Sequence, residues 1–189
     1  MKDEFSEATM LRSVGLFKVI KEDFNRNKRD LTGPGFQALL MHRIGSYSTI
    51  CSAPLRLVLT LLYRLGYVFC RNFYGIELAR STNIGRRLEI GHQHGIVIHR
   101  HATIGDDCMI RQGVTFGISN EWIAGRGPVI GNNVHFGVGS ILIGNVNIGD
   151  NVTVGPHCVI SADVPANTTV FLPPPRIIPK ARTVAEEGE

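Results

Sequence analysis

The sequence contains no CxxC pair, and its four cysteines are far apart along the chain. This spacing argues against a disulfide framework and predicts reduced thiols, packed as small apolar side chains in a cytosolic protein, at Cys51, Cys70, Cys108 and Cys158. The N-terminal stretch MKDEFSEATM is acidic and polar, unlike a secretory signal. No nucleic-acid-binding motif is present, and a net charge of +4 is too small to indicate a nucleic-acid partner.

Acidic residues are also missing from one long stretch. No Asp or Glu occurs between Leu31 and Ile76, whereas four arginines do: Arg43, Arg56, Arg64 and Arg71. Hydrophobic residues make up 43% of the 189 residues and charged residues 19%, which is typical of a globular chain and not of a disordered one.

The first part of the chain has the apolar spacing of helices. A first helix is expected from about Thr9, with one apolar face formed by Leu11, Val14, Phe17 and Ile20. After the break at Gly33-Pro34-Gly35, a second is expected over 36–47, with Leu39, Leu40 and Ile44 inward. Pro54 marks the start of a third, over 55–73.

That third stretch contains too few uncharged residues in a row to span a membrane, because Arg56 and Arg64 interrupt it. We therefore expect a buried or interfacial helix. Arg56, Arg64 and Arg71, at intervals of eight and seven residues, lie within about one quadrant of it. Such a stripe fits either a plain solvated face or a peripheral contact with anionic lipid at the inner face of the membrane.

From Ile84 onward the apolar period becomes six. Aliphatic or aromatic residues recur at Ile84, Ile90, Ile98, Ile104, Ile110, Phe116, Ile130, Phe136, Leu142, Ile148, Val154 and Ile160. Glycine immediately follows eight of them: Gly85, Gly91, Gly105, Gly117, Gly131, Gly137, Gly149 and Gly155. Mostly small or aliphatic residues stand four places after the anchors, including Leu88, Ala102, Cys108, Val114, Val134, Ser140, Val146, Val152 and Cys158.

A six-residue period suits neither an α-helix nor a simple strand. It predicts a chain that makes a short strand, turns a corner and repeats, with three sides per coil and parallel pairing between coils. The anchors would stack inside this prism, and the glycines would free its corners from steric limits on φ. The period slips near Gly95 and again between Phe116 and Ile130, where extra residues leave the coil.

The repeat resembles the hexapeptide-repeat acyltransferases, and within them the serine acetyltransferase-like family. The segments that carry the likeness are GIELARSTNIGRRLEIGHQHGIVI (75–98), the VTFG turn, GPVIGNNVHFGVGSILIG (127–144) and ISADVPANTTVF. The resemblance implies a mainly β fold, a left-handed parallel β-helix preceded by a short α-helical N-terminal region. We expect the helical region over 1–74, the β-helix over 75–170 and a C-terminal extension over 171–189.

By this resemblance the protein is an acetyl-CoA-dependent O-acetyltransferase. His92 matches the family's catalytic histidine, which removes the proton of an acceptor hydroxyl as that hydroxyl attacks the thioester. Glu77 matches the acid that orients and stabilises the imidazole, a position that often carries Asp. Acetyl-CoA is the implied co-substrate, and no metal is expected.

The resemblance also assigns binding residues. The excursion loop over 117–127 covers the active site in relatives. Arg126, in this loop, matches a residue that contacts an acceptor carboxylate. Trp122 is a candidate for stacking on adenine or a sugar, or for holding the loop against a neighbouring subunit. Backbone N–H groups near Gly117 are candidates for the oxyanion site. A small-residue stretch along which CoA lies in relatives is matched by Gly137, Val138 and Gly139. Arg176 matches a basic residue near the CoA phosphates.

Three departures bear on the acceptor. Gly91 and Gly127 stand where serine enzymes carry an aspartate and a second histidine, and Asn27 stands about where an acceptor-binding aspartate is expected. The two glycines would leave room for a ring. We therefore expect a saccharide acceptor, as in capsule, exopolysaccharide or lipopolysaccharide synthesis, with L-serine, as in cysteine biosynthesis, as the alternative.

A metal-dependent alternative rests on the histidines at 92, 94, 99 and 101, because histidines of adjacent subunits bind zinc in carbonic anhydrases of this fold. Those proteins lack the N-terminal helices, so we favour the transferase. His94 is expected to pack inward or at a corner. Relatives place the CoA site between two subunits, which predicts a homotrimer or a multiple of three.

Overall fold

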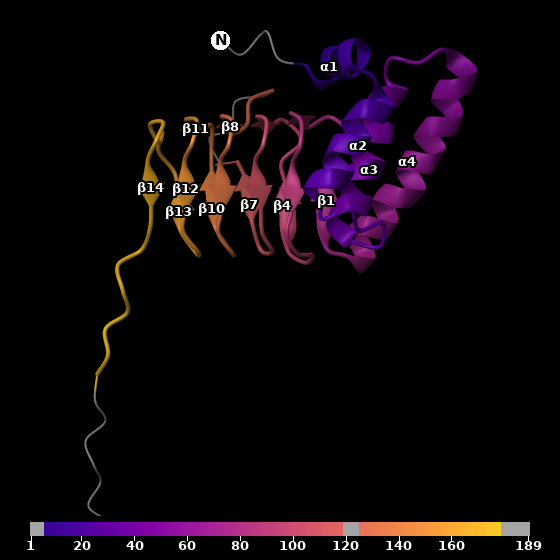
Figure 1. Cartoon of the computed structure of the whole chain (residues 1–189). Coiled ribbons are helices and arrows are strands. Elements are labelled where there is room, and N and C mark those ends of the chain that lie inside the picture. The colour runs from indigo at the N-terminus through magenta and orange to yellow at the C-terminus, as the bar shows by residue number, and fades with distance from the viewer. Residues whose placement is uncertain (1–5, 119–124, 179–189) are drawn as a thin grey trace, which may run out of the picture.

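The computed structural model describes residues 6–118 and 125–178, and in these residues four helices precede fourteen short strands. Figure 1 shows the helices gathered at one end of a column of strands, with the C-terminal segment leaving the other end. The helices are α1 (Glu7–Val14), α2 (Leu16–Arg26), α3 (Pro34–Ser48) and α4 (Ala53–Phe73). Proline lies in the first turn of α3 and of α4. The start of α4 agrees with the prediction from Pro54, whereas α3 begins two residues earlier than predicted, at Pro34 within the expected break.

The single first helix predicted from Thr9 is wrong. Gly15, at φ 93°, divides it into α1 and α2. Its predicted apolar face is also wrong, because Phe17 is 87% exposed whereas Leu11 and Val19 are buried. Two carboxylates, Glu7 and Asp23, take the other buried positions, so ionic partners rather than hydrophobicity decide which face of α1 and α2 points inward.

The strands form three parallel sheets, and each of the first four coils contributes one strand to each sheet, whereas the last coil contributes to the first and third only (Figure 1). The first sheet contains β1 (Ile76–Leu78), β4 (Ile96–Ile98), β7 (Thr115–Gly117), β10 (Ile141–Ile143) and β13 (Val159–Ile160). The second contains β2 (Asn83–Ile84), β5 (Thr103–Ile104), β8 (Val129–Ile130) and β11 (Asn147–Ile148). The third contains β3 (Glu89–Ile90), β6 (Met109–Ile110), β9 (His135–Phe136), β12 (Thr153–Val154) and β14 (Thr169–Val170). The chain is the expected left-handed parallel β-helix.

The apolar residues of the hexapeptide repeat form the core of the β-helix. All twelve apolar anchors are at most 6% exposed, and the small residues four places after them are at most 4% exposed. Equivalent anchors lie in register between coils, as in the pairing of Ile84 with Ile104 and of Ile104 with Ile130. The predicted inward stacking of the repeat is therefore confirmed.

The reason predicted for the glycines after the anchors is wrong. None of the eight has a positive φ, so they do not relieve a backbone restriction. They are needed because successive coils touch. A Cβ on Gly105 would lie 2.5 Å from the carbonyl oxygen of Gly131, and one on Gly137 would lie 2.6 Å from the nitrogen of Pro156. Gly91 and Gly117 are exceptions, since the nearest neighbour of a Cβ at either would be 3.6 Å away.

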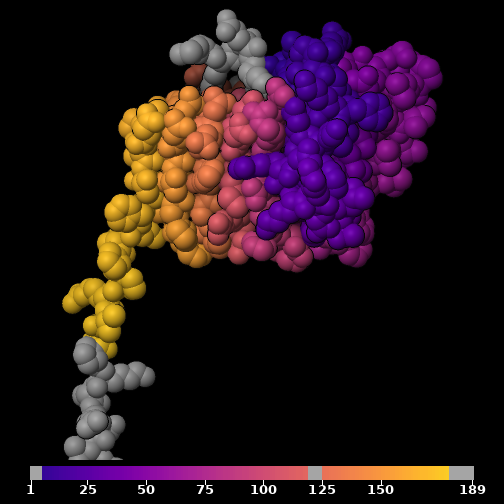
Figure 2. Space-filling view, in the orientation of Figure 1, coloured from indigo at the N-terminus to yellow at the C-terminus, as the bar shows by residue number. Residues whose placement is uncertain are grey.

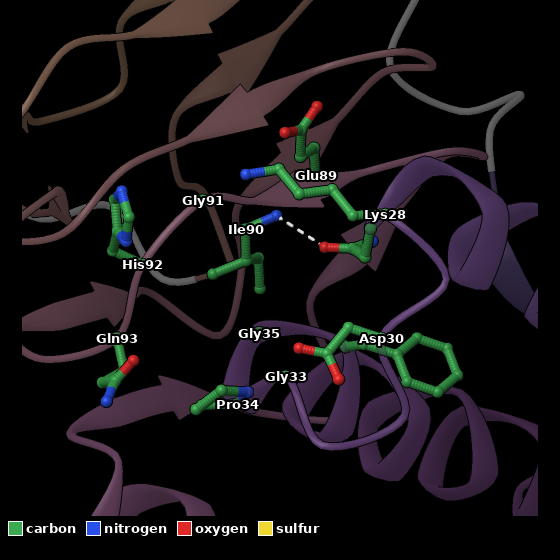
Figure 3. A pocket seen from close by; sticks show the side chains of 12 residues that line it. Lys28, Asp30, Gly33, Pro34, Gly35, Glu89, Ile90, Gly91, His92 and Gln93 are labelled. Carbon is green, nitrogen blue, oxygen red and sulfur yellow. Dashed lines mark hydrogen bonds between the residues drawn. The ribbon is translucent and has the colours of Figure 1, made fainter.

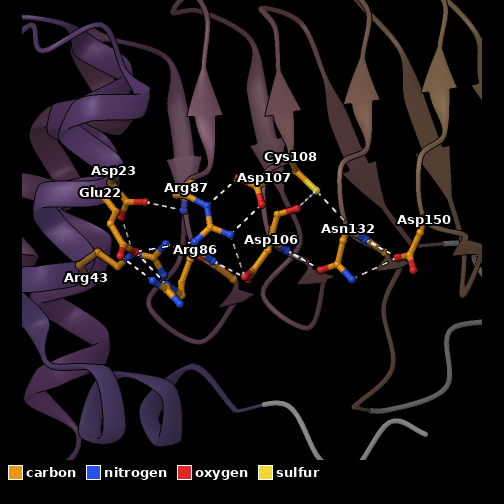
Figure 4. A network of polar contacts seen from close by, with 12 residues as sticks. Glu22, Asp23, Arg43, Arg86, Arg87, Asp106, Asp107, Cys108, Asn132 and Asp150 are labelled. Atoms are coloured by element: carbon orange, nitrogen blue, oxygen red, sulfur yellow. Dashed lines mark hydrogen bonds and ion pairs between the residues drawn. The ribbon is translucent and has the colours of Figure 1, made fainter.

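In the turns that follow the second sheet, the residue two places after the glycine position adopts the left-handed conformation, and this residue is Asn or Asp more often than Gly. Positive φ values of 53–60° recur there in five coils, at Arg87, Asp107, Asn133, Asn151 and Asn167. The residues before them form a ladder in which each side-chain oxygen accepts the backbone N–H of the preceding coil: Asp106 from Arg86 at 2.8 Å, Asn132 from Asp106 at 2.8 Å and Asp150 from Asn132 at 2.6 Å (Figure 4).

The helices are joined to the first coil by a buried ionic cluster. Arg43 of α3 is fully buried and donates to Glu7 at 2.8 Å, to Asp23 at 2.9 Å and to the carbonyl oxygen of Ile84 at 2.8 Å. His42 contacts the second oxygen of Glu7 at 2.8 Å. Since these partners come from α1, α2, α3 and β2, the cluster sets the position of the helices relative to the corner that follows β3.

Candidate active site

His92 lies at the corner that follows β3, beside a hollow of about 270 Å³. One wall of this hollow is the segment 89–93, and the other is the turn between α2 and α3, residues 27–36 (Figure 3). The imidazole is exposed and therefore accessible to a substrate. The hollow joins residues about 60 positions apart in the sequence, so the docking of the helices creates it.

The side-chain amide of Asn27 is hydrogen-bonded to the backbone of this corner, so its polar atoms are not available to a ligand in the hollow. Its amide nitrogen donates to the carbonyl oxygens of Leu88 at 2.9 Å and Asp23 at 2.8 Å, and its oxygen accepts the N–H of Ile90 at 3.1 Å. The side chain is buried, and all its principal hydrogen bonds hold β3 against α2. Asn27 is thus a structural residue at the position where an acceptor-binding acid was expected.

Two carboxylates that no sequence motif marks, Asp30 and Glu89, line the same hollow as His92. Glu89 is paired with Arg26 at 3.4 Å. Asp30 accepts hydrogen bonds from the backbone N–H and hydroxyl of Thr32, which lower the pKa of its carboxyl group, and it forms no ion pair within 6–118 and 125–178. Asp30 therefore places a negative charge at the hollow, which Lys28 also lines. Only the fold brings Asp30 close to the segment of His92.

Glu77 points outward from β1 into a different hollow, which Tyr63, Tyr67 and Arg100 also line. Burial, and secondarily the charge of Glu77, raises the pKa of Tyr67. Both Glu77 and His92 belong to the described residues, and no hydrogen bond joins them there. The pairing of Glu77 with His92 stays a prediction.

Arg126 is exposed and lines a third hollow, together with His101 and Asn145. Within one chain it therefore lines a different hollow from that of His92. Gly127 is buried, and a Cβ there would lie 2.6 Å from the carbonyl oxygen of His101. The space expected at this glycine is therefore absent, whereas Gly91 does have space beside it.

The remaining candidates lie along the β-helix. Gly117 ends β7, and its carbonyl oxygen accepts the N–H of Gly144 at 3.1 Å. The segment Gly137, Val138 and Gly139 is a half-buried turn after β9, in which Gly139 has φ 66°. Arg176 is exposed in the C-terminal extension, and Trp122 lies outside the described residues.

The other histidines and the cysteines are also placed. His94 is exposed at a corner with φ 74°, one of the two predicted placements. In the described part of the chain no three His, Cys, Asp or Glu side chains are grouped closely enough to hold a metal ion. The four cysteines are free thiols; three are buried, and burial raises the pKa of Cys70 and Cys108 to about 11.

Comparisons with known proteins agree with this architecture. The family described as bacterial transferase hexapeptide (six repeats) matches residues 127–162. A serine acetyltransferase of Synechococcus elongatus is 35% identical over 174 residues, covering 86% of this chain and 69% of the relative. A serine acetyltransferase of Helicobacter pylori is 34% identical over 178 residues, covering 93% and 97%.

A solved structure extends the likeness to three dimensions. The Neisseria gonorrhoeae serine acetyltransferase in complex with serine superposes with a TM-score of 0.69 at 28% identity, covering 88% of this chain and 70% of that one. The protein is therefore an acyltransferase with acetyl-CoA as its co-substrate. The chain belongs to the serine acetyltransferase family of hexapeptide-repeat acyltransferases.

Proposed function

We propose that this protein transfers the acetyl group of acetyl-CoA to the hydroxyl of L-serine. The likeness to the Helicobacter pylori enzyme over nearly the whole of both chains supports this acceptor, as does the serine bound in the Neisseria structure. The saccharide acceptor expected from the departures at positions 27, 91 and 127 finds no support among the relatives. Gly127 does not leave room for a sugar ring, because even a Cβ there would clash with the carbonyl oxygen of His101.

The observation that carries the proposal is the charge beside His92. Serine is a zwitterion, and a desolvated ammonium without an anion costs several kcal/mol. Asp30 supplies such an anion in the hollow that His92 lines (Figure 3). It answers the objection that Gly91 and Asn27 have replaced the family's acceptor-binding carboxylates.

The carboxylate of serine needs a cation, and Arg126 is the candidate that the family suggests. Since Arg126 and His92 line different hollows of one chain, we propose that a neighbouring subunit supplies Arg126. A cyclic trimer with its axis along the β-helix brings the corner of one subunit against a face of the next. The site would then be complete only in the assembled protein.

In the proposed reaction His92 accepts the proton of the serine hydroxyl while the hydroxyl oxygen attacks the thioester carbonyl carbon. The C–O bond forms, and the negative charge moves to the carbonyl oxygen, near the backbone of Gly117. Collapse of this tetrahedral intermediate breaks the C–S bond. The imidazolium returns its proton to the sulfur, which gives O-acetylserine and CoA.

The test measures thiol release from acetyl-CoA with L-serine, with a panel of sugars and with no acceptor. Asp30→Asn should raise the KM for serine by about tenfold or more, because it removes the charge that faces the ammonium, and should leave the KM for acetyl-CoA unchanged. Glu89→Gln is the matched control, since Arg26 already neutralises that carboxylate. Efficient acetylation of a sugar with none of serine would refute the proposal.

A further inference from the structure

The outer face of α4 is apolar and faces no other part of the described chain. Within this 21-residue helix only Tyr63 and Cys70 are buried. Nine apolar side chains are 45–72% exposed and are here called the α4 apolar face: Leu55, Leu57, Val58, Leu61, Leu62, Leu65, Val68, Phe69 and Phe73. A contiguous apolar surface of this kind marks a site of interaction with a membrane or a protein.

The charged residues of α4 distinguish between a membrane and a protein partner. Arg56, Arg64 and Arg71 are exposed on the same helix, and no acidic residue occurs between Leu31 and Ile76. At about 100° per residue, Arg64 and Arg71 lie next to the edge of the apolar face marked by Leu57. An apolar face with arginines along one edge fits a surface that is apolar inside and anionic outside. We propose that α4 lies flat on an anionic lipid bilayer.

A second copy related by a two-fold axis is a poorer occupant of this face. In a two-fold contact between two α4 helices, the arginines of both copies would approach one another. The helix has no carboxylate to pair with them, so the contact would bring like charges together. Lipid phosphates supply the missing negative charge.

By length and composition the helix is apolar enough to cross a membrane, so the expectation that Arg56 and Arg64 alone rule out a span is wrong. Its inner side, however, is packed: Gly66 lies directly against Met41 of α3, and the Tyr63 hydroxyl accepts the backbone N–H of Arg80 at 3.1 Å. Crossing would break these contacts and place Arg64 in hydrocarbon, which is costly. An interfacial position keeps the packed side on the protein and the arginines at the headgroups.

A hollow between α3 and α4 lies beside this face. It measures about 460 Å³ and is lined mainly by apolar side chains: Leu31, Phe36, Leu40, Met41, Leu65 and Phe69. Leu65 and Phe69 belong to both the hollow and the α4 apolar face, so the two surfaces are continuous. Figure 2 shows α4 at the outer end of the helical region, on the side away from the C-terminal segment. A bilayer can therefore reach α4 without meeting the β-helix.

The experiment is co-sedimentation of the full chain with vesicles of phosphatidylcholine alone or with added phosphatidylglycerol. We expect binding to the anionic vesicles, weakened by salt. Arg56→Gln/Arg64→Gln/Arg71→Gln should bind about 100-fold more weakly. Arg12→Gln/Lys18→Gln/Lys21→Gln is the matched control, because it removes the same charge from exposed positions of α1 and α2. Leu57→Ser/Leu61→Ser/Leu65→Ser should also abolish binding, with circular dichroism as the check of folding.

Three results would overturn the proposal. The first is no binding to either kind of vesicle, or equal binding to both. The second is self-association, in the absence of lipid, that the leucine substitutions abolish while vesicle binding is absent; that result assigns the face to a second copy. The third is retention on vesicles after alkaline carbonate washing, which indicates a spanning helix. Because none of these measurements uses enzyme activity, they are independent of the identity of the acceptor.

Discussion

Among single residues, His92 is the proposed general base, and its exposure beside the hollow fits that role. His92→Ala should lower kcat by about 10²–10⁴-fold, since general-base assistance is worth that much, and should leave binding of CoA nearly unchanged. Glu77→Gln should lower kcat less, because the imidazole remains. Thiol release and CoA titration measure the two effects.

His94→Asn is the control for His92. It changes an exposed histidine at the same corner, and asparagine tolerates the φ of 74° found there. Its activity should be close to that of the unmodified protein. Near-normal turnover of His92→Ala would remove His92 from the mechanism.

The glycines give a second prediction for single residues. Gly105→Ala should destabilise the fold by about 1–3 kcal/mol, because its Cβ would meet the backbone of Gly131 at 2.5 Å and push two coils apart. Gly91→Ala should be nearly neutral, since its nearest neighbour lies 3.6 Å away. Urea unfolding of the two variants makes the comparison. Equal stability would show that the coils do not need close contact at Gly105.

Among the secondary-structure elements, the buried cluster around Arg43 decides how α1, α2 and α3 meet the β-helix (Figure 4). Burial by itself raises the pKa of Glu7, but the charges of His42 and Arg43 outweigh it, so the net shift is downward. Burial also raises the pKa of Asp23, and there Arg43 compensates only in part. The two carboxylates therefore respond to acid in opposite directions.

This difference predicts a pH dependence. Because the pKa of Glu7 is lower in the folded state, its contribution is complete above the unfolded value of about 4.3 and is lost as pH falls through the folded pKa. Asp23 opposes part of this loss. Urea midpoints should thus fall below about pH 4.3. Glu7→Gln should be less stable at neutral pH by about 3–5 kcal/mol and should lose less on acidification.

Glu22→Gln is the comparison for Glu7. Glu22 binds Arg86 at the surface, where a hydrogen bond from Arg86 lowers the pKa of its carboxyl group. Because solvent screens this pair, its loss should cost about 1 kcal/mol or less. Equal losses for the two variants would contradict a dominant role for the buried cluster.

For the whole molecule, the separation of His92 from Arg126 leads to a complementation experiment. Subunits carrying His92→Ala and subunits carrying Arg126→Ala should each be weakly active at low serine concentration. Mixed trimers should recover activity, because about a third of their sites would combine an intact His92 with an intact Arg126 of the neighbour. Sedimentation should give a trimer or a multiple of three. Activity no higher than the sum of the separate variants would place both residues in one subunit's site.

The sequence by itself determined the β-helix. A six-residue repeat of apolar anchors is a local pattern, and each anchor needs only its equivalents in adjacent coils to be buried, as Ile104 is between Ile84 and Ile130. The start of α4 at a proline was equally local. His92, Glu77 and Arg126 could be named because each lies in a continuous motif that resembles the family's.

Only the tertiary structure decided which face of α1 and α2 is buried, since the partners of Glu7 and Asp23 come from α3 and the first coil. It alone brought Asp30 to the hollow of His92, because no local pattern links residues about 60 positions apart. The tertiary structure also gives the reason for the glycines after the anchors: the neighbouring coil excludes a Cβ that the backbone angles would allow. Local periodicity specifies an element, whereas contacts distant in sequence specify how elements meet and which side chains share a site.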